Sequence, residues 1–332
     1  MADGPLLRVE QLSTHFDTRA GLVRAVDGVS FHVDAGETLG LVGESGCGKS
    51  VLSRTIMGLL PSYARVPDQS RILFNGTDLL TLGRRQRRAI SGPGLAMVFQ
   101  DPMTSLNPVL RIGEQISESM RFHFGTPRAE GRRKAISLLG DVGIPQPEVR
   151  VDQYPHQMSG GMRQRVAIAI ALACEPKLLI ADEPTTALDV TVQAGILELL
   201  KDAQRRRGMA MILITHDLGV VAGRADRVAV MYAGRIVETA PVRELFARTR
   251  MRYTQALLDS IPRLDAPPHT RLNAIAGRPP SLIDPPAGCR FAPRCAAAQE
   301  RCRVEVPDLS ADSGCAAHSF ACWFPRGLEA AA

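Results

Sequence analysis

A short glycine-rich segment constrains the fold of this 332-residue chain more than any other feature: residues 43–50 are GESGCGKS. The segment follows an apolar stretch over 38–42, expected to be a strand, and precedes a stretch over 49–60 whose spacing predicts a helix. Glycines at such a junction let backbone N–H groups surround phosphate oxygens at the positive end of the helix. The pattern GxxxxGKS in this context therefore predicts a loop that binds nucleotide phosphates.

Side chains of this loop have separate expected roles. The ammonium of Lys49 is expected to hold the β- and γ-phosphates, and the hydroxyl of Ser50 to bind Mg²⁺. Cys47 is expected to be a loop side chain and not a nucleophile. The residues assigned here to ATP binding are Gly43, Ser45, Gly46, Cys47, Gly48, Lys49, Ser50 and Val51.

A second apolar run, over 178–181, ends in the carboxylates Asp182 and Glu183. Asp182 is expected to hold Mg²⁺, directly or through water, since carboxylates are preferred ligands of this ion. Glu183 lies one residue further on and is expected to polarise the water that attacks the γ-phosphate. The alternative is a surface acid pair at the end of a strand, which leaves the upstream phosphate loop unexplained.

Residues 158–165, MSGGMRQR, resemble the signature motif of ABC-transporter ATPases. The usual motif has Leu first and Gln fifth, where this chain has Met158 and Met162, but the Ser-Gly-Gly core and Arg-Gln-Arg remain. Ser159 and the glycines would begin a helix whose positive end receives a phosphate. The resemblance implies that this phosphate belongs to ATP bound by an opposite subunit. The residues implied are Ser159, Gly160, Gly161 and Met162.

Three further segments match the same family in order along residues 6–240, which makes a chance match negligible. Gln100 follows a predicted strand over 95–99 and resembles the Q-loop, which implies contact with Mg²⁺ and with the attacking water. Asp189 ends a segment, TALD, that resembles the D-loop of the dimer interface. His216 resembles the switch histidine, implied to contact the γ-phosphate and organise Glu183, although a lone histidine is more often structural.

Recognition of adenine is the least defined part of the expected site. The family stacks an aromatic side chain on the base, well before the phosphate loop, and Phe16 is the best candidate. The alternative is that Phe16 is a buried residue of a strand.

Strands alternate with helices along most of the chain, which predicts an α/β domain with a largely parallel sheet. The resemblance implies a P-loop NTPase (RecA-like) core with an antiparallel β subdomain and an α-helical subdomain at about 102–170. Prolines gather beyond residue 262 and indicate an extended linker. We therefore predict an ABC ATPase domain over 1–260 and a small Cys-rich C-terminal extension, regulatory or iron–sulfur, over 261–332.

The remaining motifs narrow the family further. Residues 100–108 and 252–258, with the signature segment, resemble the D-type ATPase subunit of oligopeptide/dipeptide importers. The implied partners are a second ABC ATPase subunit in a heterodimer, two transmembrane permeases and an extracytoplasmic substrate-binding protein. Nickel importers share these motifs, so the sequence leaves the substrate open.

Composition bears on location and on nucleic-acid partners. No signal peptide is visible, and the longest apolar run, over 166–174, is too short to span a bilayer, so we expect a peripheral protein at the cytoplasmic face of the cell membrane. The net charge is +6, but the arginine clusters are not interleaved with aromatics, so no nucleic-acid partner is expected. ABC ATPases that act on nucleic acid or ribosomes usually carry tandem ATPase units or coiled-coil insertions, and this sequence has neither.

Five of the seven cysteines follow residue 288. The spacing Cys289-x5-Cys295-x6-Cys302, with Cys322 further on, resembles the C-terminal cysteine module of the same importer family. Four thiolates suit a [4Fe–4S] cluster. Zinc would accept the same ligands, although its usual pairs are more closely spaced, and buried thiols without metal are a third reading. Cys315 lies outside the family pattern. An iron–sulfur redox protein alone would leave the ATPase motifs unexplained.

Overall fold

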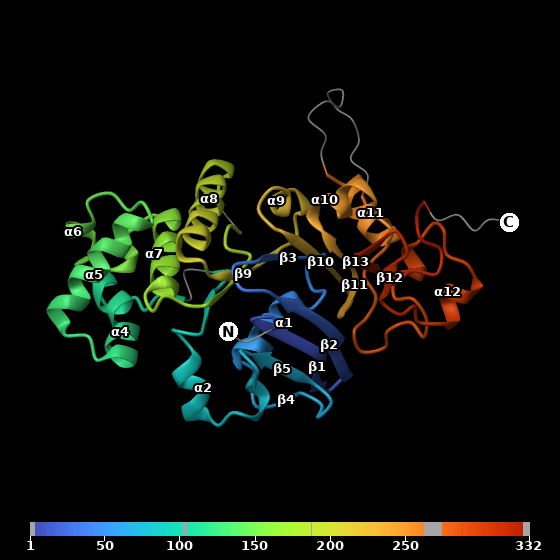
Figure 1. Cartoon of the computed structure of the whole chain (residues 1–332), viewed down its shortest axis with the longest axis horizontal. Helices are drawn as coiled ribbons and strands as arrows, with labels where there is room; N and C mark the ends of the chain where they lie inside the picture. The colour runs from blue at the N-terminus through green and yellow to red at the C-terminus, as the bar shows by residue number, and fades with distance from the viewer. Residues whose placement is uncertain (1–3, 102–104, 187, 262–273, 328–332) are drawn as a thin grey trace. The chain divides into compact units, whose positions relative to one another are not determined.

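The computed structural model describes residues 4–101, 105–186, 188–261 and 274–327. Figure 1 shows the chain with its helices and strands labelled. Two compact units can be distinguished, and each is described by itself. The first consists mainly of Asp78–Ile214 together with Val33–Glu37, and the second of Leu7–His32, Thr38–Thr77 and the chain from Thr215 onward.

The first unit contains three parallel strands in the order β9-β8-β7. They are β7 (Leu95–Val98), β8 (Leu178–Asp182) and β9 (Ala210–Thr215), and all of their residues are buried. Burial on both faces explains why these strands are continuous apolar runs in the sequence. Parallel pairing brings their carboxyl ends to one edge, where Gln100 and the Asp182–Glu183 pair follow β7 and β8.

Helices make up much of the rest of the first unit, in agreement with the α-helical part of the predicted fold class, whereas the bounds of about 102–170 stay a prediction. α4 (Ile112–Phe124), α5 (Arg128–Asp141) and α7 (Gly160–Leu172) pack against one another and appear in green in Figure 1. Ile112, Ile116, Leu139 and Val166 are completely buried between them. The other helices are η1 (Leu79–Thr81), α2 (Arg84–Ile90), α6 (Pro147–Arg150), η2 (Pro155–Gln157) and α8 (Val190–Arg207).

The second unit begins with the expected antiparallel β subdomain. Its strands run in the order β2-β1-β5-β6, and β4 pairs with the other end of β1. Burial alternates at the start of β1, where Leu7 and Val9 are buried and Arg8 is exposed, as in a sheet with one face on a core. The strands are β1 (Leu7–Thr18), β2 (Gly21–Val33), β4 (Ala64–Arg65), β5 (Arg71–Phe74) and β6 (Thr77–Asp78).

A second set of strands in this unit runs β12-β13-β11-β10-β3. β3 (Thr38–Val42) is parallel to β10 (Arg227–Tyr232), whereas β11 (Arg235–Pro241), β13 (Cys315–Phe320) and β12 (Ser310–Asp312) pair antiparallel. The C-terminal region therefore adds two strands to the edge of β11, which the sequence did not predict. The helices are α1 (Lys49–Met57), α9 (Leu218–Val221), α10 (Val242–Ala247), α11 (Arg252–Asp259), η3 (Ala292–Arg294) and α12 (Glu300–Val304).

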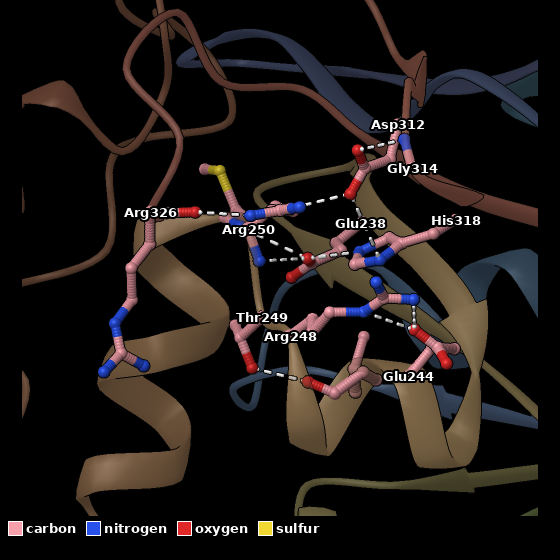
Figure 2. A network of polar contacts seen from close by, with 11 residues as sticks. Glu238, Glu244, Arg248, Thr249, Arg250, Asp312, Gly314, His318 and Arg326 are labelled. Carbon is pink, nitrogen blue, oxygen red and sulfur yellow. Dashed lines mark hydrogen bonds and ion pairs between the residues drawn. The ribbon is translucent and has the colours of Figure 1, made fainter. Parts of the chain in front are cut away.

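Buried charges join these added strands to β11, as Figure 2 shows. His318 of β13 and Glu238 of β11 are completely buried, with 2.8 Å between Nε2 and Oε1. The Nε of Arg250 donates to the Asp312 carboxylate of β12 over 2.6 Å. Buried ion pairs cost desolvation, but losing one partner leaves an uncompensated charge, so we expect the Arg250–Asp312 pair to be needed for the docking of these strands.

The strands and helices expected from the sequence are confirmed, with shifted ends. The helix predicted over 49–60 ends at Met57 because Gly58 takes a left-handed conformation, φ 68°, and its N–H caps the last turn. The proposed linker residues 262–273 and residues 102–104 of the Q-loop segment lie outside the described residues. The domain boundary near 260 stays a prediction.

Candidate functional site

The predicted phosphate loop, residues 43–50, connects β3 to α1 in the second unit. Gly48 is the N-cap of α1, with φ 106°, a conformation that side chains other than glycine rarely adopt. A Cβ at Gly43 would lie 2.1 Å from the carbonyl oxygen of Met231, and a Cβ at Gly48 would lie 2.1 Å from that of Ala25. Both glycines are therefore required by contact with neighbouring backbone.

Lys49 points back over this loop. Its Nζ donates to the carbonyl oxygens of Gly43 and Glu44 over 2.7 and 3.1 Å, and the residue is only 4% exposed. A buried ammonium over the helix N-terminus is placed to receive phosphate oxygens. The Cys47 thiol is buried, which raises its pKa and disfavours the thiolate.

The acid pair lies at the carboxyl end of β8 in the first unit, and both side chains are buried. The Glu183 carboxylate accepts a hydrogen bond from Gln100 Nε2 over 2.9 Å and one from Thr186 Oγ1 over 3.0 Å. Two residues assigned to catalysis from separate motifs, Gln100 and Glu183, are thus in contact. The Thr186 hydroxyl was not expected as a partner, although it begins the predicted D-loop segment.

The backbone of Glu183 has φ 45°, unusual for a residue other than glycine, asparagine or aspartate. Its N–H donates to the carbonyl oxygen of Ile214 at the end of β9, over 3.0 Å. Strain of about 1–3 kcal/mol persists only where the surroundings enforce it, and such residues gather at functional sites. The backbone conformation and the hydrogen bonds together therefore fix the orientation of the Glu183 carboxylate at the end of β8.

The N-termini of α7 and α8, both in the first unit, lie close together. Ser159 caps α7, accepting from the Met162 N–H over 3.3 Å, and Asp189 caps α8, accepting from the Val192 N–H over 2.9 Å. A Cβ at Gly161 would lie 2.9 Å from Val192 Cγ1, so the first turns of the two helices are in contact. The signature segment thus opens a helix, as expected. Ala187 of the D-loop lies outside the described residues.

Two further predicted residues, Phe16 and His216, belong to the second unit. Phe16 is half-buried on β1, and its ring lies 6.0 Å from that of Tyr63, which is 63% exposed. Tyr63 was not predicted, because no motif marks it. His216 follows β9 and is exposed, while Asp217 next to it caps α9 by accepting from the Gly219 N–H over 2.7 Å.

Comparison with known proteins identifies the family. Residues 26–186 match the family model described as ABC transporter. The chain is 51% identical over 318 residues to the dipeptide transport ATP-binding protein DppD of Bacillus subtilis, covering 96% of this chain and 94% of that one. This chain belongs to the ABC-transporter ATPases.

Further matches place this ABC-transporter ATPase among peptide-transport relatives. Residues 237–302 match the model described as oligopeptide/dipeptide transporter, C-terminal region. The oligopeptide transport ATP-binding protein OppD of Bacillus subtilis is 54% identical over 289 residues, covering 87% of this chain and 81% of that one. ATP with Mg²⁺ is the expected substrate and ion for this family. Among the described residues, none of the helices has the length and apolar character needed to cross a membrane.

Solved structures show the same fold as this ABC-transporter ATPase. A dimeric ATP-binding cassette, determined in a post-hydrolysis state with ADP and phosphate, superposes with a TM-score of 0.64 and 26% identity, covering 71% of this chain and 99% of that one. The cbiO1 protein of Clostridium perfringens, part of the transporter complex cbiONQ, gives a TM-score of 0.62 and 31% identity, with coverages of 74% and 92%. The predicted α/β P-loop class is therefore confirmed.

The C-terminal cysteines of this ABC-transporter ATPase gather at one place. One small cavity is lined by Cys289, Cys295, Cys302 and Cys322, together with Phe291 and Trp323, whereas Cys315 does not line it. Burial raises the pKa of the Cys289 and Cys295 thiols, and that of Cys322 to about 11. Within the described ranges, no group of three or more His, Cys, Asp or Glu side chains is arranged to hold a metal ion. The expected cluster is therefore not supported by a formed metal site.

Proposed function

We propose that this ABC-transporter ATPase is the ATP-binding and ATP-hydrolysing subunit of an importer for oligopeptides or dipeptides. The observation that carries the ATPase role is the Glu183 carboxylate, held by Gln100 and Thr186 at the end of β8. The peptide part is supported by relatives named for dipeptide and oligopeptide transport and by the match over 237–302. Nickel import is the alternative.

In this proposal, each motif takes one task in hydrolysis. Lys49 holds the β- and γ-phosphates, and Ser50, Asp182 and Gln100 hold Mg²⁺, which neutralises phosphate charge. Glu183 accepts a proton from the attacking water. The oxygen of this water bonds to the γ-phosphorus as the bond between the γ-phosphorus and ADP breaks. The fixed orientation of the Glu183 carboxylate supports this assignment.

The remaining site residues complete the ATP site in a dimer. The start of α7, with Ser159, Gly160, Gly161 and Met162, faces the γ-phosphate of ATP bound by the other subunit, and Asp189 lies beside it at the interface. His216 contacts the γ-phosphate of the nucleotide on its own chain. Phe16 stacks on adenine, and its neighbour Tyr63 extends the same aromatic surface.

The proposed assembly contains four subunits besides this chain, of three kinds. They are a second ABC ATPase subunit forming a heterodimer, two transmembrane permeases and an extracytoplasmic binding protein that delivers the peptide. The relatives' names and the C-terminal family match support this arrangement. We place the chain at the cytoplasmic face of the membrane, attached through the permeases.

We also propose that the cysteine cavity holds a [4Fe–4S] cluster through Cys289, Cys295, Cys302 and Cys322. Convergence of these four thiols on one cavity supports the ligand set, and the exclusion of Cys315 agrees with it. The cavity of about 20 Å³ is small, so the thiols would move apart on binding. Anaerobically purified Cys322→Ser protein should then lose iron and acid-labile sulfide, while Cys315→Ser protein retains both. Zinc without iron in the parent protein would overturn the cluster.

The Glu183→Gln variant tests the hydrolytic role. Amide replacement removes the proton acceptor but keeps the shape, so kcat should fall by about 10²-fold or more, while ATP remains bound to the purified protein. Turnover is measured as phosphate release and retention as nucleotide in acid extracts. Glu198→Gln, an exposed change on α8, is the matched control and should leave both values unchanged. Hydrolysis by Glu183→Gln at the parent rate would refute this role.

A further inference from the structure

An arginine of the cysteine-rich region contacts the phosphate loop. Arg294 lies in η3, next to Cys295, and its Nη1 and Nη2 donate to the two carboxylate oxygens of Glu44 over 2.7 and 2.9 Å. The Arg294 side chain is 3% exposed and that of Glu44 is 26% exposed. A paired contact of this geometry is among the stronger polar interactions in proteins. It joins residues 250 positions apart within the second unit.

The guanidinium of Arg294 is fixed on every side. Its Nη1 also donates to the Tyr232 hydroxyl over 3.2 Å, and its Nε donates to the Ala276 carbonyl over 3.0 Å. The rings of Tyr232 and Phe291 lie 5.8 and 6.0 Å from its central carbon. This arrangement uses the planar fork of arginine, which lysine cannot reproduce.

Glu44 is the only acidic residue of the phosphate loop, residues 43–50. Its carbonyl oxygen accepts the hydrogen bond from Lys49 Nζ, and its N–H donates to the Tyr253 hydroxyl over 3.0 Å. The Glu44 backbone therefore touches the ammonium proposed to hold the phosphates. Without Arg294, the loop that is proposed to bind a triphosphate would carry an uncompensated carboxylate, and like charges interact unfavourably.

A second arginine of the same region contacts the turn that supports the loop at Cys47. Arg290, next to Cys289, donates to the Ala233 carbonyl and to the Asp27 carboxylate. The following residue, Gly234, donates its N–H to the Cys47 carbonyl over 2.8 Å. The turn between β10 and β11 thus connects Arg290 to the loop. One segment of the cysteine-rich region therefore contacts the loop directly at Glu44, through Arg294, and supports Cys47 indirectly, through Arg290 and the turn.

We propose that Arg294 is a positioning residue for ATP binding, which neutralises Glu44 and fixes the start of the phosphate loop. The inference rests on the proposed ATP-binding function of Lys49 and its loop. If Arg294 has this role, tight nucleotide binding requires the cysteine-rich region to be folded, whether or not a cluster is present.

Titration of the full-length chain with a fluorescent ATP analogue tests this proposal. Arg294→Gln leaves Glu44 unpaired, so the Kd should rise roughly tenfold, and the deficit should shrink at high ionic strength. Glu44→Gln alone should bind about as tightly as the parent. The double variant should regain most of the lost affinity, within about threefold of the parent. Arg301→Gln, at an exposed ion pair of the same region, is the control and should have no effect.

Different outcomes would refute the proposed ATP-binding function and the role of Arg294. A parent chain that fails to bind the analogue would refute the proposed function. A parent that binds, with Arg294→Gln binding equally well or with the double variant as weak as Arg294→Gln, would refute the role of charge neutralisation. If Arg294→Gln unfolds, Arg294→Lys retains the charge. Because lysine keeps the charge but not the planar fork, its Kd should rise by less than about tenfold, and a rise of about tenfold or more would contradict charge neutralisation.

Discussion

Single residues with no room for a side chain define the phosphate loop. We expect Gly43→Ala to weaken ATP binding by more than about tenfold, because its Cβ would lie 2.1 Å from the Met231 carbonyl oxygen and the loop must shift. Gly140→Ala is the matched control, since no heavy atom lies within 4 Å of its Cβ position in α5. It should bind ATP normally and raise the free energy of unfolding by about 0.5–1 kcal/mol. Nucleotide titration measures the affinity for ATP, and urea unfolding measures the free energy of unfolding. Normal ATP binding by Gly43→Ala would contradict this prediction.

Much of the site could be predicted residue by residue because each motif is local. The contact of Gln100 with Glu183 joins two such motifs, and both were expected in catalysis. Tyr63 and Arg294 were missed for different reasons. Tyr63 is an exposed residue without a motif, and the partner of Arg294 is 250 positions away in the sequence, so no spacing signals the pair.

Among the elements, the docking of β12 and β13 on β11 depends on buried charge. Arg250→Gln should lower the free energy of unfolding by about 3 kcal/mol, because it leaves the Asp312 carboxylate, 2% exposed, without its guanidinium. Arg248→Gln is two positions away and removes a surface pair with Glu244, so its cost should stay below about 0.5 kcal/mol. Figure 2 shows both pairs. Denaturant unfolding measures the loss in free energy of unfolding for each variant. Equal losses would show that the buried pair contributes no more than the surface pair.

Low pH should weaken the docking of β12 and β13 on β11. A hydrogen bond from the Gly314 N–H, with the Arg250 guanidinium, holds the pKa of Asp312 below its ordinary value near 3.8. The charged carboxylate is thus favoured in the folded state, and its contribution is full above that value and lost as pH falls through the lowered native pKa. Asp312→Asn should remove this part of the acid dependence, measured as stability between pH 5 and 2. An unchanged acid profile would refute this assignment.

The elements that the sequence predicted well are those with strong periodic signals. β7, β8 and β9 are continuous apolar runs because both of their faces are buried. β12 and β13 gave no comparable signal, since β12 has three residues and most of the pair is not buried. Their position depends on pairing with β11 and on His318, a long-range contact that local pattern does not encode.

At the scale of the whole molecule, the residues assigned to ATP binding and hydrolysis fall into two sets. The phosphate loop, Phe16 and His216 belong to the second unit, whereas the acid pair and the start of α7 belong to the first. ATP hydrolysis is assigned to this chain, and peptide import to the assembly that it joins. ATP turnover alone would not separate these claims, because any ABC ATPase hydrolyses ATP.

Peptide uptake by the reconstituted complex, with this chain as the D-type subunit, tests the central claim most directly. Proteoliposomes containing ATP should accumulate a labelled dipeptide or oligopeptide when the binding protein supplies it. Uptake should fall to background with the Glu183→Gln chain and remain normal with Glu198→Gln. Accumulation of Ni²⁺ without peptide, or peptide uptake undiminished by Glu183→Gln, would contradict the account.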